Sequence, residues 1–82
     1  MKSIESTIEP MLSSDYKERF KAEYEQTRIR YLKLKAVVTK YYQGTLEFEL
    51  SCPIDILIDQ LDIMQSYIDI LEIRATIENV EL

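Results

Sequence analysis

Two long heptad patterns, separated by Gly44, the only glycine, constrain the fold more than any other feature of the chain. Their spacing of four and three residues keeps side chains on one face of an α-helix. The first pattern comprises Phe20, Tyr24, Thr27, Tyr31, Leu34, Val38 and Tyr41. The second comprises Leu57, Leu61, Met64, Ile68, Leu71 and Ala75. With 82 residues in total, the chain is predicted to be one all-α domain built on a long antiparallel helical hairpin.

Helix start and stop signals give the expected boundaries. Asp15 and Glu18 have the spacing of a capping box, and Gly44 is suited to a left-handed helix end. Pro53 favours the first turn of a helix. We therefore expect the following segments: an N-terminal leader over 1–13 and a hairpin domain over 14–82, with helices over about 15–43 and 53–78 and a connector over 44–52.

The leader and the connector are less strongly specified. The leader contains few apolar residues around Pro10, and is either a short helical turn packed on a neighbour or partly disordered. The connector alternates apolar and polar residues but is too short and isolated to build a sheet. Its Leu46, Phe48 and Leu50 are expected to pack onto the helices.

The second helix has a further apolar stripe besides its heptad seam. The stripe consists of Ile56, Ile63, Tyr67, Ile70 and Ile77. A hairpin buries only one face of each helix, and a helix that is apolar on two faces must bury both. The sequence therefore predicts a homo-oligomer, either a four-helix dimer or a larger symmetric assembly.

Composition excludes several classes of chemistry. The chain has no His, one Cys and one Gly, so it lacks the residues for Ser/His or Cys/His catalysis, for a Cys/His zinc site and for a phosphate-binding glycine loop. We expect no enzyme, no cofactor and no metal site. Asp55, Asp59 and Asp62 share one side of a helix, but such a stripe is more often a hydrated surface than a metal site.

The expected location is the cytoplasm. Met1 to Ser14 has acidic residues and no apolar core region, unlike a secretory signal. Acidic residues interrupt the apolar runs of the second half before they reach membrane-spanning length. Cys52 has no partner for a disulfide within the chain, which fits a reducing compartment.

The net charge of −5 is distributed unevenly. Residues 17–40 contain eight basic and three acidic residues, whereas residues 41–82 contain one basic and nine acidic residues. One interpretation is a basic helix that packs against an acidic one. The other is that part of the basic helix faces an anionic ligand. Binding of long nucleic acid is less expected, because an acidic chain repels phosphate over most of its surface.

Tyrosines on or beside the basic helix add a second binding element. A tyrosine ring can stack on a nucleobase, while neighbouring Arg and Lys donate to phosphate oxygens. Tyr24, Tyr31 and Tyr41 occupy heptad positions, where a core role with a wet edge is more common. Tyr16 lies in the first turn, where free backbone N–H groups also attract anions.

An ordered set of residues over 15–77 carries a family resemblance. In the first helix it reads Tyr16-x-x-Arg19-Phe20-x-x-Glu23, then Arg30-x-x-Lys33-Leu34; in the second it reads Leu57-x-x-Gln60-Leu61-x-x-Met64-x-x-Tyr67-x-x-Ile70-Leu71-x-x-Arg74. The set resembles small helical phage proteins that act as sponges for cyclic oligonucleotides and so counter cyclic-oligonucleotide-based antiphage signalling. The leader is longer than in that pattern, and the connector departs from it.

The resemblance implies a non-catalytic homo-oligomer, hexameric in known members, that binds cyclic dinucleotides or trinucleotides between protomers. Tyr16 would stack on a base, Arg30 or Lys33 would hold a phosphate, and Arg74 would hold a phosphate at a second kind of oligomer site. Arg19 completes the candidate ligand-binding set. Arg74 alternatively pairs with a neighbouring acid on its own helix.

Two other functions fit the same residues. One is a helical interaction protein that inhibits a host protein through its second apolar stripe or its leader. It also fits an RNA-binding hairpin dimer that uses the basic helix, for which retention of RNA would depend steeply on salt.

Overall fold

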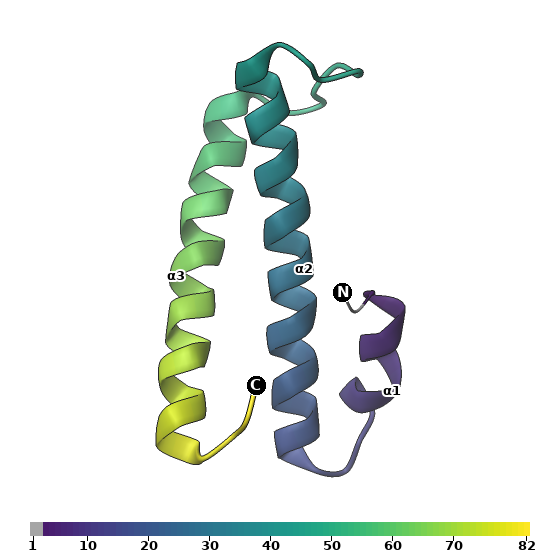
Figure 1. Ribbon diagram of the computed structural model, residues 1–82, viewed down its shortest axis with the longest axis vertical. Coiled ribbons are helices and arrows are strands. Elements are labelled where there is room, and N and C mark those ends of the chain that lie inside the picture. The colour runs from purple at the N-terminus through teal and green to yellow at the C-terminus, as the bar shows by residue number, and fades with distance from the viewer. Residues whose placement is uncertain (1–2) are drawn as a thin grey trace.

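The computed structural model describes residues 3–82, and within that range it contains helices and loops but no strand. A short helical turn η1 (Glu5–Thr7) leads into α1 (Ile8–Met11), and the long helices α2 (Tyr16–Gln43) and α3 (Ile54–Glu78) follow. Figure 1 shows α2 and α3 side by side and antiparallel, with α1 beside the N-terminal half of α2, on the side away from α3. The all-α prediction is confirmed. Residues 1–2 of the expected leader lie outside the described residues.

The ends of α2 are defined by hydrogen bonds to its terminal backbone groups. The Asp15 carboxylate accepts from the Lys17 backbone N–H at 2.9 Å. The Asp15 N–H in turn donates to Ser13 Oγ at 3.1 Å, so Ser13 takes the place that a capping box would give to Glu18. At the other end Gly44 is left-handed, with φ 74°, as its position predicted.

The ends of α3 differ from expectation in detail. Pro53 has an extended ψ of 143° and lies just before the first helical residue instead of within the first turn. Asn79 ends the helix in the left-handed region, with φ 57°. The chain then folds back, and the Val80 N–H donates to the Ala75 carbonyl at 2.8 Å. This return of the C-terminus was not predicted.

The core lies at the open end of the hairpin, away from the connector. Phe20 of α2 packs with Leu71 and Ala75 of α3 and with the returning Val80, and Tyr24 packs against this cluster. Leu71 is completely buried. The predicted seams meet here, and Val80 covers their end.

A second buried face of α2 lies against the leader. Ala22 and Ile29 are buried, although neither belongs to the heptad seam. They are seven residues apart and so lie on one side of the helix. The completely buried Thr7 belongs to the leader, and its hydroxyl donates to the Ile4 carbonyl at 2.6 Å. The described part of the leader thus forms short helical turns that pack on α2 of its own chain.

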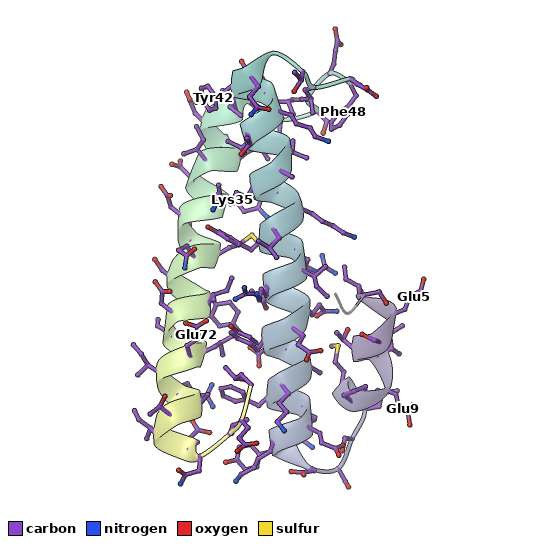
Figure 2. The ribbon with its side chains drawn as sticks, viewed as in Figure 1. Glu5, Glu9, Lys35, Tyr42, Phe48 and Glu72 are labelled. Carbon is purple, nitrogen blue, oxygen red and sulfur yellow. The ribbon has the colours of Figure 1, made fainter. Side chains whose placement is uncertain are left out.

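The connector packs only partly. Leu46 and Leu50 are half-buried, but Phe48 is 58% exposed, so the expectation that it packs onto the helices is wrong. Figure 2 shows Phe48 on the loop and Tyr42 at the end of α2.

Candidate functional site

Contacts between α2 and α3 define two different flanks of the hairpin. On one flank the Tyr24 hydroxyl donates to Glu72 Oε2 at 2.6 Å, and Arg28 Nη1 donates to the Tyr24 hydroxyl at 3.3 Å. Figure 2 shows Glu72 on the side of α3 that faces α2. On the other flank the Arg74 guanidinium lies over the Phe20 ring, 4.8 Å from its centre. We call these the Tyr24 flank and the Arg74 flank.

The Arg74 flank carries most of the predicted site residues. Glu78, and after it Glu23 and Tyr16 of α2, raise the pKa of Arg74, so both α2 residues lie within electrostatic range of its guanidinium. Arg19 and Arg30 share the face of Glu23, because they are separated from it by four and seven residues. Lys33, three residues after Arg30, lies at the edge of this face.

The five predicted residues do not converge on one point of a single chain. Tyr16, Arg19 and Arg74 lie at the open end of the hairpin, whereas Arg30 and Lys33 lie near its middle. The fourteen residues from Tyr16 to Arg30 correspond to about 21 Å along the helix axis. A small ligand therefore contacts only one of these two groups within a single copy.

Tyr16 and Arg19 are held differently at the start of α2. Tyr16 is the first helical residue and its side chain is 46% exposed. Arg19 Nη1 donates to the Ser13 carbonyl at 2.7 Å, which ties this cation to the turn between the leader and α2. The ring of Tyr16 is accessible to a ligand, and the guanidinium of Arg19 already contributes to local structure.

Arg74 forms an ion pair on its own helix. Its Nε and Nη2 donate to the Glu78 carboxylate at 2.8 and 3.4 Å. The hydrogen bond to Glu78 is the main reason that the pKa of Arg74 is raised above its usual value. The pairing with a neighbouring acid, the alternative foreseen for this residue, is therefore present in the free chain.

Arg30 and Lys33 are the uncommitted cations of the candidate set. Both are exposed, and neither makes a side-chain hydrogen bond, an ion pair or a ring contact within residues 3–82. Their neighbours on the Tyr24 flank are engaged: Arg28 bonds to Tyr24, and Lys35 lies 5.9 Å from the centre of the Tyr31 ring. The Arg74 flank thus offers donors that no group of the described chain uses.

An acidic groove between the leader and α2 was missed by sequence reasoning. Its lining includes Glu5 and Glu9 of the leader together with Glu18 and Lys21 of α2. The excess of carboxylates disfavours a phosphate ligand. Only the tertiary position of the leader creates this groove, so helical periodicity contains no signal for it. Figure 2 labels both leader carboxylates.

Two further observations concern metals and membranes. Within residues 3–82, no group of three or more acidic or cysteine side chains is arranged to hold a metal ion, and this range includes Asp55, Asp59 and Asp62. Among the described helices, none has the length and apolarity needed to cross a membrane.

Comparison with known proteins places these features in a family. No curated protein and no solved structure shows significant similarity to the chain. A family model described as Sequestin matches residues 14–77, which comprise the cap of α2, all of α2, the connector and all but the last residue of α3. The family name denotes sequestration, in agreement with the coarse expectation of a small sequestering helical protein. Because the match covers most of its length, the chain belongs to the Sequestin family.

Proposed function

We propose that the protein binds a cyclic dinucleotide or trinucleotide signal between protomers and sequesters it unchanged, as a phage counter-defence protein in the host cytoplasm. The observation that carries this proposal is the pair of uncommitted cations on one flank, Arg30 and Lys33. Membership of the Sequestin family supports sequestration. The resemblance in the ordered residue set supports the cyclic oligonucleotide as ligand.

The chemistry of the Arg74 flank suits such a ligand. A guanidinium donates to two phosphate oxygens at once, and a lysine ammonium adds a compact positive charge. The half-exposed ring of Tyr16 supplies a surface on which a base can stack. These groups bind and orient a nucleotide, and the proposal assigns no bond-breaking step to them.

The distance between Tyr16 and Arg30 supports binding between copies. A ligand held by both needs one of them from a second chain, because about 21 Å of helix separates them within one chain. Sequestration benefits from such an arrangement, since a ligand enclosed by two chains dissociates only when the enclosure opens.

Native mass spectrometry tests the proposal directly. The protein is measured alone and with a panel of cyclic dinucleotides and trinucleotides, and the bound nucleotide is recovered after heating. We expect adducts on a discrete oligomer and an intact nucleotide. A linear product would contradict sequestration, and an oligomer that ignores the whole panel would favour the alternative of a host protein partner.

Paired variants locate the site. Arg30→Ala and Lys33→Ala are each expected to weaken binding at least tenfold. Their matched controls Arg28→Ala and Lys35→Ala remove the same charges two residues away on the Tyr24 flank, and should change affinity less than threefold. Equal losses in both members of a pair would show that net charge, and not this flank, attracts the ligand.

A further inference from the structure

The outer face of α3 carries a row of exposed isoleucines at a strict seven-residue spacing. This isoleucine stripe consists of Ile56, Ile63, Ile70 and Ile77, with exposed fractions of 54%, 69%, 54% and 73%. Tyr67 lies beside it and is 40% exposed. Monomeric proteins rarely leave an apolar patch of this length in water.

The surface area of the chain indicates how much of it an assembly would cover. The single chain exposes 6082 Å². A folded monomer of 9.7 kDa is expected to expose about 5100 Å². The excess of roughly 1000 Å² is close to the ~800 Å² that each partner buries in a standard interface. One further helix packed along the stripe would remove an area of this size.

Charges beside the stripe identify the orientation of that partner helix. If two α3 helices pack antiparallel about a twofold axis between Ser66 and Tyr67, Ile56 faces Ile77 of the second copy, and Ile63 faces its Ile70. In the same register Asp59 faces Arg74 of the second copy. Both of these side chains are exposed in the single chain.

A parallel arrangement would be opposed by the same charges. It would place Asp59 against Asp59 and Arg74 against Arg74, and would align the two helix dipoles. The antiparallel register alone combines isoleucine packing along the whole stripe with attraction between opposite charges at both of its ends.

We propose that a second copy of this chain covers the isoleucine stripe, through an antiparallel α3–α3 interface in which Ile63 faces Ile70 and Asp59 faces Arg74. The interface is isologous, so both copies use the same surface and the assembly closes as a dimer or as the dimeric unit of a larger symmetric oligomer.

This interface brings Arg30 of the two copies to one height. Tyr24 lies opposite Glu72, and the helices are antiparallel. Six residues further along α2, Arg30 is therefore level with Ser66 of α3, next to the twofold axis. The inference rests on the proposed function only here, because it sets the Arg30 side chains of two copies at the height of one twofold axis. Its test requires no ligand.

Cross-linking of the ligand-free protein tests the register. In a Cys52→Ser background, Ile63→Cys and Ile70→Cys are prepared separately and then mixed under mild oxidation. The mixture is expected to form a disulfide-linked dimer at least fivefold faster than Ile63→Cys alone, because residues 63 of the two copies are seven residues from register. Faster cross-linking of Ile63→Cys alone would overturn the antiparallel arrangement.

Sedimentation equilibrium tests the face itself. Ile63→Glu is expected to raise the dissociation constant of the assembly at least tenfold, while its helix content stays unchanged by circular dichroism. Gln65→Glu adds the same charge two residues away on the Tyr24 flank and should leave the constant within threefold. A monomeric parent chain, or equal effects of the two variants, would overturn the proposal.

The two proposals fail in different ways. An assembly with the predicted cross-link that binds no nucleotide would remove the proposed function and leave the interface intact. An oligomer that binds nucleotide through Arg30 but lacks the cross-link between residues 63 and 70 would do the reverse.

Discussion

The hydroxyl of Tyr24 donates to the carboxylate of Glu72 at 2.6 Å and so joins the N-terminal part of α2 to the C-terminal part of α3. Arg28 donates to the same hydroxyl, so the contact is part of a three-residue chain. The contact fixes how far the two helices are shifted along each other. The position of Arg30 level with Ser66 of α3 follows from this alignment.

Removing either partner of this contact is expected to destabilise the hairpin modestly. Tyr24→Phe and Glu72→Gln should each lower the free energy of unfolding by about 1 kcal/mol, because hydrogen bonds to charged groups contribute more than neutral ones but this pair is reached by solvent. Urea denaturation at fixed protein concentration measures the loss. The double variant should lose less than the sum of the two; full additivity would show that the contact contributes nothing.

The free energy of unfolding should also fall at high pH, because the Tyr24 phenol ionises. Burial, followed by the bond to Glu72, raises the pKa of Tyr24 above its usual value near 10. The protonated phenol is therefore favoured by folding, and this contribution is complete below pH 10 and is lost as pH rises through the folded pKa. Between pH 9 and 11.5, Tyr24→Phe should show a shallower decline in stability than the parent chain. If stability declines equally with pH in both proteins, ionisation of Tyr24 is not the cause.

The returning C-terminus is expected to contribute to the core. Val80→Ala should lower the free energy of unfolding by about 1–2 kcal/mol, because Val80 is buried beside Phe20 and Leu71. Thermal or urea unfolding measures the effect. Leu82→Ala is the control, since Leu82 is 51% exposed and its truncation should cost about 0.5 kcal/mol or less. Similar losses at both positions would indicate a general effect of the terminus.

Ligand affinity should depend on salt through the uncommitted cations. Raising NaCl from 50 to 500 mM is expected to weaken nucleotide binding severalfold, because phosphate contacts with exposed cations are screened. Arg30→Ala should reduce this salt dependence, whereas Tyr16→Ala should weaken binding at every salt concentration to a similar extent. Titration calorimetry separates the two patterns. A salt dependence that Arg30→Ala leaves unchanged would place the phosphate elsewhere.

The two long helices and the first of their caps follow from local rules. Heptad spacing places Phe20 and Leu71 on facing seams, and only Gly44 among the residues near that position adopts a left-handed conformation without strain. Asn79 is also a recognised helix-ending residue, so the end of α3 had a local signal that was overlooked. Homo-oligomerisation, the ligand and the roles of the site residues stay predictions.

The sequence by itself determined the all-α hairpin, its seams and the second apolar stripe of α3, because helical periodicity depends only on the order of side chains along the chain. Only the tertiary structure decided where the leader lies, that Val80 returns to the core, and that Arg74 stacks on Phe20 while Arg30 and Lys33 remain uncommitted. These features join residues up to about sixty positions apart, and their energies come from packing and charge contacts between elements, which local periodicity does not encode.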